Sequence, residues 1–368
     1  MRRALVLGIA ILAACAPRLP ELIIATTPPA ILLPTVKAAI IDGRGRFREI
    51  YCAVRADHGA KLPFDRPCDT SAALWQLPGE APPSGRPVDL NRSTAGLTVV
   101  MVPGLLAECL ASKSTVFADA RADLEAQGYR TGYIQTRGRQ SSEIDADIIR
   151  DAIRAMPADA RIILVTHSKG TVDSLVALAS YPDLATKIVA LVSVAGAVNG
   201  SPLADVVPDW VAQLAESIAL PECPQGHGVE AADSLRRSTR LAWLATHTWP
   251  ARVRTYSLVA VAGADDTAAV LRPFHTILAR IEPANDSLVV ASDAIIPGST
   301  LLGYAHADHL AVAMPFTGLL AATLITHNDY PRAVLLEAAI RYVEEDLRRS
   351  DAPRIASTSV PLRPRKID

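Results

Sequence analysis

The stretch LVTHSKGTVD, residues 164–173, joins an apolar run to a helix-like segment through a serine. The residues RIILV at 161–165 are β-branched or apolar, as expected for a buried strand. The residues TVDSLVALA at 171–179 are compatible with a helix. A serine at such a strand–turn–helix junction is either an exposed nucleophile or simply the N-cap of the helix.

The residues around Ser168 are those of a tight turn, with one departure. Such a turn has room only for small residues two positions before and two positions after the serine, because larger side chains collide across it. Gly170 meets this condition, and Thr166 does not. We expect the His167 ring to point away from Ser168 and to pack in the protein interior. The Lys169 side chain either attracts an anionic substrate or is a solvated lysine at a helix start.

Apolar runs alternate with helical patterns from residue 97 onward. Buried strands are expected at 97–102, 129–135, 161–166, 187–195 and 252–261, with helices at 114–127, from 142 to before Pro157, at 169–180 and at 331–349. The pattern SEID at 142–145 is typical of a capping box. Strands buried on both faces that alternate with helices predict an α/β fold with a mostly parallel, doubly wound sheet.

The chain divides into several segments around this core. Residues 1–14 have the basic start and short apolar run of a signal peptide, and LAAC at 12–15 is similar to a bacterial lipobox that would place a lipid on Cys15. Residues 15–36 are a Pro-rich tether, 37–95 an irregular N-terminal extension, 96–350 the main domain and 351–368 a tail. Helical stretches at 203–219 and 229–247 predict a cap at about 200–250, over the carboxyl edge of the sheet. The apolar run 310–326 is interrupted by Pro315 and Gly318, so we expect it to be buried or to line a cleft.

The cysteines fit an exported protein. Without Cys15, four remain, namely Cys52, Cys68, Cys109 and Cys223. Two disulfides with three possible connectivities are then expected in an oxidising compartment. Cys52 with Cys68 is the local choice, which would leave Cys109 with Cys223.

The main domain resembles the α/β-hydrolases, and more closely the bacterial lipases and esterases, from about residue 97 to 349. In that family a loop after the first core strand supplies an oxyanion donor, and VMVPGLL at 100–106 stands at that point, with Pro103 where the family usually has His. The resemblance therefore implies Ser168 as nucleophile and the amides of Leu105 and Lys169 as the oxyanion hole. The stretch NGSPLAD at 199–205 is similar to the one that opens the cap in such lipases.

The resemblance also implies the other two members of a catalytic triad. NDSLV at 285–289 is similar to the family's Asn-Asp-Gly-x-Val, which makes Asp286 the acid, with Asp265, Asp266 and the weaker Asp293 as alternatives. The motif HADHL at 306–310 offers two histidines, and His309 fits the family's Asp-His better than His306. A zinc pair of His306 and His309 has no third ligand nearby in the sequence.

These features predict a serine carboxylic ester hydrolase that forms an acyl-enzyme and acts on an ester or lipid with apolar acyl parts. It needs no metal and no organic cofactor. The alternatives are an acyltransferase with the same triad and a non-catalytic, membrane-anchored binding scaffold. The formal net charge of −1 and the absence of basic blocks argue against nucleic acid as a partner. The expected location is the bacterial cell envelope, lipid-anchored at Cys15, with the protein at the outer membrane facing the periplasm.

Overall fold

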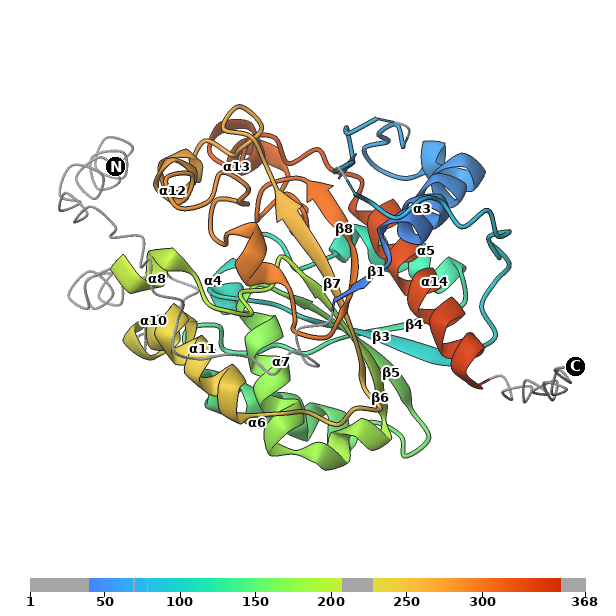
Figure 1. The fold of residues 1–368 in the computed structure, drawn as a ribbon, viewed down its shortest axis with the longest axis horizontal. Helices are drawn as coiled ribbons and strands as arrows, with labels where there is room; N and C mark the ends of the chain where they lie inside the picture. The colour runs from blue at the N-terminus through green and yellow to red at the C-terminus, as the bar shows by residue number, and fades with distance from the viewer. Residues whose placement is uncertain (1–39, 69, 78, 207–227, 352–368) are drawn as a thin grey trace, which may run out of the picture.

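The core of the protein is a mostly parallel sheet, as the sequence predicts. The computed structural model describes residues 40–68, 70–77, 79–206 and 228–351. Within these ranges seven strands run parallel in the order β1-β8-β7-β6-β5-β3-β4, and β2 pairs antiparallel with β8 (Figure 1). The strands are β1 Ile41–Asp42, β2 Leu74–Trp75, β3 Leu97–Val102, β4 Arg130–Tyr133, β5 Arg161–His167, β6 Ile188–Val194, β7 Arg254–Val261 and β8 Thr300–His306.

Helices cover both faces of this sheet. In Figure 1, α14 and α3 lie on one side and α6 and α7 on the other. The described α-helices are α3 Arg44–His58, α4 Ala107–Leu110, α5 Arg121–Ala126, α6 Ser142–Ala155, α7 Lys169–Ser180, α8 Pro202–Val206, α10 Gly228–Leu235, α11 Arg237–Thr246, α12 Arg272–Leu278, α13 Gly318–Thr323 and α14 Arg332–Asp351. The short 3₁₀ helices are Gly59–Lys61, Ala118–Ala120, Pro182–Thr186 and Ala291–Ala294.

Alternate residues of the central strands enter two different cores. On β5, Ile163 and Val165 pack with α3 and α14, whereas Ile162 and Leu164 pack with α6 and α7. Because successive side chains of a strand point to opposite faces, both faces of β5 are buried, and its run is apolar throughout. The doubly wound fold predicted from the sequence is therefore confirmed.

The N-terminal extension differs from the prediction, because residues 37–95 are not wholly irregular. Helix α3 occupies Arg44–His58 and packs against α14, and β1 and β2 join the sheet beside β8. Phe47, Ile50, Tyr51 and Val54 are buried on one face of α3, at spacings that predict an amphipathic helix. The sequence of α3 carried this signal, although residues 37–95 as a whole are rich in Pro and Gly.

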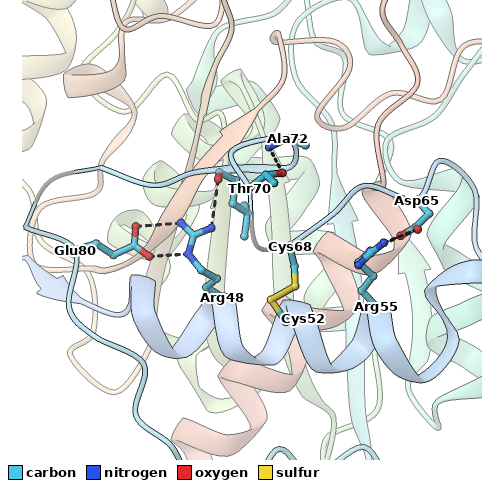
Figure 2. The surroundings of a disulfide bond; sticks show 9 residues. Arg48, Cys52, Arg55, Asp65, Cys68, Thr70, Ala72 and Glu80 are labelled. Atoms are coloured by element: carbon cyan, nitrogen blue, oxygen red, sulfur yellow. Dashed lines mark hydrogen bonds and ion pairs between the residues drawn. A yellow bond between two sulfur atoms is a disulfide. The ribbon is translucent and has the colours of Figure 1, made fainter.

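The predicted local disulfide is confirmed. Cys52 of α3 is bonded to Cys68 of the following loop, with their Cα atoms 5.4 Å apart (Figure 2). Arg48 and Arg55, on either side of Cys52 in the helix, pair with Glu80 and Asp65. Cys109 is also disulfide-bonded, and Cys223, its expected partner, lies outside the described residues.

Several other predictions need correction or lie beyond the structure. The N-cap of α6 is Ser141, whose hydroxyl accepts a hydrogen bond from the Ile144 amide at 3.4 Å. The cap therefore lies one residue before Ser142, where the capping box was expected. The helix expected at 114–127 is only α5, preceded by a 3₁₀ turn. Residues 1–39 and 352–368, which hold the expected leader, Cys15, the tether and the tail, are outside the described ranges, as are residues 207–227 of the expected cap.

The apolar segment 310–326 is only partly buried. Residues 311–314 and Phe316 join the core, but Leu319 of α13 is 71% exposed. In the described part of the chain, no helix is both long enough and apolar enough to cross a membrane.

Removal of the Cys52–Cys68 disulfide should destabilise the protein. Closing a loop of this length lowers the entropy of the unfolded chain, which raises its free energy by about 3 kcal/mol. We expect the double variant Cys52→Ser/Cys68→Ser to lose about 2–3 kcal/mol of unfolding free energy in urea titrations. A double variant as stable as the parent would show that the loop is already ordered by its other contacts.

Candidate active site

The direction in which the chain moves across the sheet reverses at the adjacent strands β3 and β5. After β3 the chain moves outward to β4, whereas after β5 it moves the other way to β6. The loops that follow β3 and β5 therefore diverge, and ligands of open α/β sheets bind at such a switch point. These two loops are the Pro103–Gly104 segment and the turn at Ser168.

Ser168 stands at the tip of a strained turn between β5 and α7. Its φ of +55° and ψ of −127° are rare for a residue with a side chain, and such strain concentrates at functional sites. The Ser168 amide donates to Val194 O at 3.3 Å, and its carbonyl accepts from Thr171 N at 3.1 Å. Although Ser168 occupies the N-cap position, its hydroxyl makes no capping hydrogen bond within the described residues. The helix-cap reading therefore does not account for this serine.

Thr166 fits beneath the turn because its hydroxyl has partners there. Its Oγ1 lies 2.8 Å from Thr171 Oγ1, which lies 3.1 Å from Ser193 Oγ. The departure from a small residue at this position is thus accommodated by a buried hydrogen-bond network. Gly170 is required sterically, because a Cβ there would lie 2.3 Å from the Pro103 carbonyl oxygen.

The loop after β3 runs directly against Ser168. A Cβ on Gly104 would lie 2.6 Å from Ser168 Cβ and 3.1 Å from the Lys169 nitrogen. The backbone at Gly104 and the first amide of α7 thus lie beside the same serine. The first amides of a helix lack partners within that helix, so they are suited to hold an anionic oxygen.

His309 and Asp286 form a buried pair. His309 Nδ1 lies 2.7 Å from Asp286 Oδ2, and the His309 amide donates to the Asp286 carbonyl at 2.8 Å. Because a carboxylate oxygen only accepts hydrogen bonds, Nδ1 donates this one, and in a neutral imidazole the lone pair is then on Nε2. The other carboxylate oxygen of Asp286 accepts the amides of Leu288 at 2.9 Å and Val289 at 2.7 Å.

The backbone of Ser287 explains why the family usually has glycine at this position, directly after the aspartate. Ser287 has a φ of +86°, which glycine adopts freely and serine adopts only with strain. The Ser287 amide donates to Asn285 Oδ1 at 3.0 Å, and this bond stabilises the turn. The sequence NDSLV therefore forms the turn that NDG would form.

The chain is similar to a carboxyl esterase of known structure. No family model and no curated protein matches the chain. A solved structure, the metagenomic carboxyl esterase MGS0156, is 54% identical, and the match covers 87% of this chain and 97% of that chain with a TM-score of 0.83. The chain belongs to the α/β-hydrolases of the esterase and lipase group.

Two more distant solved structures also match the chain. The mature Bacillus licheniformis lipase BlEst2 is 18% identical over 70% of this chain and 96% of that chain, with a TM-score of 0.49. Lipase 1 from Pelosinus fermentans is 12% identical over 67% and 98%, with a TM-score of 0.46. The match to MGS0156 covers more of this α/β-hydrolase than residues 97–349, so it includes part of the N-terminal extension.

His167 links the elbow of this α/β-hydrolase to His309. Its Nε2 lies 2.9 Å from the His309 carbonyl oxygen, and the two rings lie 4.7 Å apart. Burial lowers the pKa of His167 to about 3, and the neighbouring His309 acts in the same direction. His167 is therefore neutral and donates from Nε2. It is buried as expected, but its bond to the backbone of His309 had no signal in the sequence.

The alternative histidine and two of the alternative acids, Asp266 and Asp293, have other partners. His306 Nε2 lies 3.0 Å from Asp266 Oδ2, and its Nδ1 lies 2.7 Å from the Ser71 carbonyl oxygen. Asp293 pairs with Arg237 at 2.9 Å. Of the candidate acids, Asp286 is thus the one that the structure bonds to His309.

Neither expectation for the Lys169 side chain is correct. It is fully buried, with Nζ 2.8 Å from both Asp145 Oδ2 and Asp173 Oδ1, so it neither faces a substrate nor lies in solvent. Burial alone lowers the pKa of Lys169, but the two carboxylates reverse this and raise it above its ordinary value. The i,i+4 spacing of Lys169 and Asp173 was a signal for part of this cluster.

One further group of side chains could in principle hold a cation. Among the described residues, His58, Asp123 and Glu337 place possible ligand atoms within 4.8 Å of one another. His58 Nε2 lies 2.6 Å from Glu337 Oε2, and Arg341 Nε donates to Glu337 Oε1 at 2.6 Å. Because these charges already pair with one another, we assign the group to anchoring α3 on α14.

The buried His167 should make the protein less stable in acid. The unfolded chain takes up this proton near pH 6.5 and the folded protein only near pH 3, so unfolding binds a proton between these values. Stability should therefore fall as the pH falls, by up to about 1.4 kcal/mol per pH unit from this group.

Substitution of His167 tests this expectation. In His167→Gln the side-chain amide can still donate to His309, but it does not titrate. Urea titrations between pH 6 and pH 4 should give a shallower pH dependence of the unfolding free energy than in the parent. Equal slopes would contradict a neutral, buried His167.

Proposed function

We propose that this α/β-hydrolase is a serine carboxylic ester hydrolase that uses Ser168, His309 and Asp286. The observation that carries the proposal is the 2.7 Å bond between Asp286 and His309, whose ring contacts that of the residue before Ser168. The 54% identity to a carboxyl esterase supports the same reaction class. The proposed triad follows the chain order nucleophile, acid, histidine of α/β-hydrolases.

The chemistry would proceed in two steps. His309 Nε2 accepts the Ser168 proton while Ser168 Oγ attacks the ester carbonyl carbon, and the amides of Leu105 and Lys169 donate to the oxyanion. Collapse of this intermediate releases the alcohol, which takes the proton from His309, and leaves an acyl-enzyme. A water molecule then gives a proton to His309 as it attacks the acyl carbon. Collapse of this second intermediate breaks the bond to Ser168 Oγ, which takes the proton back from His309, and releases the acid. Asp286 keeps the proton on Nδ1 and stabilises the imidazolium.

Apolar side chains beside the nucleophile favour an apolar substrate. Leu105 and Leu106 follow Gly104 directly and are 42% and 43% exposed. Large apolar side chains that remain exposed next to a reactive group can bind an acyl chain through the hydrophobic effect. We therefore infer that esters with apolar acyl parts are preferred.

Active-site labelling tests the nucleophile. A fluorophosphonate probe should label the purified protein, and Ser168→Ala should abolish both labelling and hydrolysis of p-nitrophenyl esters. Labelling that persists in Ser168→Ala would move the nucleophile elsewhere. A parent protein that never labels would support a non-catalytic scaffold instead.

A pair of aspartate variants tests the acid. Asp286→Asn should lower kcat by about 10⁴-fold, because the amide no longer holds the required tautomer of His309. Asp293→Asn is the matched control, since Asp293 is equally buried but pairs with Arg237, and it should keep kcat within a few-fold. Equal losses in the two variants would remove Asp286 from the triad.

We also propose that the protein is attached to the cell envelope through a lipid on Cys15. The basis is the sequence LAAC at 12–15 after a short apolar run. Several acyl chains on one cysteine anchor stably, whereas a single chain binds only marginally. Cys15→Ser should release the protein from the membrane fraction of the expressing bacterium. A mature protein whose mass shows an unmodified Cys15 would refute the anchor.

A further inference from the structure

A cluster of buried charges lies directly behind the nucleophile. The ammonium group of Lys169 contacts Asp145 of α6 and Asp173 of α7, both at 2.8 Å, and all three side chains are fully buried. Burial of such charges costs several kcal/mol per ion, and apolar residues of similar size are often as stable. The cluster is therefore a weak source of stability, and its contacts suggest another role.

Asp145 connects this cluster to the loop after β4. Its Oδ2 accepts from Lys169 Nζ, while its Oδ1 accepts from the Arg137 backbone amide at 2.8 Å. A carboxylate can accept on both oxygens at once, which an amide side chain cannot do. Asp145 thus joins the start of α7 to residue 137.

The loop at 137–138 in turn presses on the loop after β3. Gly138 has a φ of +44°, and a Cβ there would lie 2.8 Å from the Leu106 nitrogen and 2.9 Å from the Gly104 carbonyl oxygen. Gly104 itself lies against Ser168 Cβ and the Lys169 nitrogen. A continuous set of contacts therefore runs from the Lys169 side chain, through Asp145 and Gly138, to the backbone that carries the Leu105 amide.

We propose that Lys169 and Asp145 are positioning residues that fix the two walls of the oxyanion hole relative to each other. This inference depends on the proposed function, because it assigns a task to the amides of Leu105 and Lys169. One wall is the start of α7, which the Lys169 side chain ties to Asp145. The other wall is the loop at 103–106, which the Asp145-bonded loop supports from behind. Preorganised donors of this kind contribute mainly to the transition state.

Asp173 provides a matched comparison within the same cluster. It is as buried as Asp145 and contacts the same ammonium group, but it lies on the same helix as Lys169. Asp173 Oδ1 accepts from Lys169 Nζ, whereas the Arg137 backbone amide donates to Asp145. Burial raises the pKa of Asp173 above its usual value, so removing its charge with an amide is a mild change.

The experiment compares Asp145→Asn with Asp173→Asn. In Asp145→Asn one oxygen remains for two donors, so either the Lys169 or the Arg137 contact is lost. We expect kcat for p-nitrophenyl ester hydrolysis to fall at least tenfold with KM within about twofold, and the affinity for a boronic acid, which forms a tetrahedral adduct on Ser168, to fall in parallel. Asp173→Asn should change kcat less than about threefold. Equal effects of the two variants on kcat would overturn the inference.

A second pair of variants keeps the test valid if Asp145→Asn does not fold. Gly138→Ala disturbs the supporting loop, where its Cβ would meet Glu108 Oε2 at 2.6 Å, and leaves Lys169, Asp145 and Asp173 unchanged. Gly79→Ala is its control, because Gly79 also has a positive φ but nothing within 4 Å of its Cβ position. Gly138→Ala should reproduce the loss of kcat, and Gly79→Ala should not. If the two glycine variants have the same kcat, the inference fails.

The outcomes separate this inference from the proposed function. A parent protein that labels at Ser168 and hydrolyses esters, with no difference within either pair of variants, refutes only the positioning role. A parent protein that neither labels nor hydrolyses esters refutes the proposed function, and the positioning role with it.

Discussion

The left-handed backbone of Ser168 persists because neighbouring strands hold it on several sides. The Ser168 amide is bonded to the end of β6, and Gly104 after β3 contacts its side chain. Gly170 allows the start of α7 to approach the Pro103 carbonyl, which any larger residue would prevent. A turn with this φ costs on the order of 1–3 kcal/mol, so the sheet has to supply that energy. The position of the Ser168 hydroxyl, the orientation of the first α7 amides and the contact of the neighbouring His167 with His309 all depend on this arrangement.

The sequence predicted the main elements of the fold and the members of the site. Strand β5 and helix α7 are long, continuous patterns, and the motif between them specifies the turn. Asp286 and His309 could be named because short motifs surround them, and the structure bonds the two residues to each other. Their roles in catalysis remain a proposal.

What the sequence did not predict depends on contacts between distant elements. The burial of Lys169 requires Asp145, 24 residues earlier, and no local pattern reports that α6 packs on α7. The bond between His167 and the His309 backbone joins residues 142 positions apart. Helix α3 was a different case, because its apolar face was visible in the sequence. One of its arginines, Arg46, is buried and pairs with Glu345 at 2.6 Å, a contact between the two ends of the chain that no local pattern reports.

The pairing of β1 and β2 with β8 has a consequence for how the chain acquires its structure. Ile41 is aligned with Thr300 and Trp75 with Tyr304, so the first strands are completed by a strand more than two hundred residues later. Contacts between residues so far apart in the chain slow folding, because the entropy of closing the long loop between them is lost before the contacts form. During vectorial synthesis the early strands remain without their neighbour until β8 has emerged. The outer edge of β8 is then covered by β1 and β2, which were synthesised long before it, and this cover protects the edge from association with other chains.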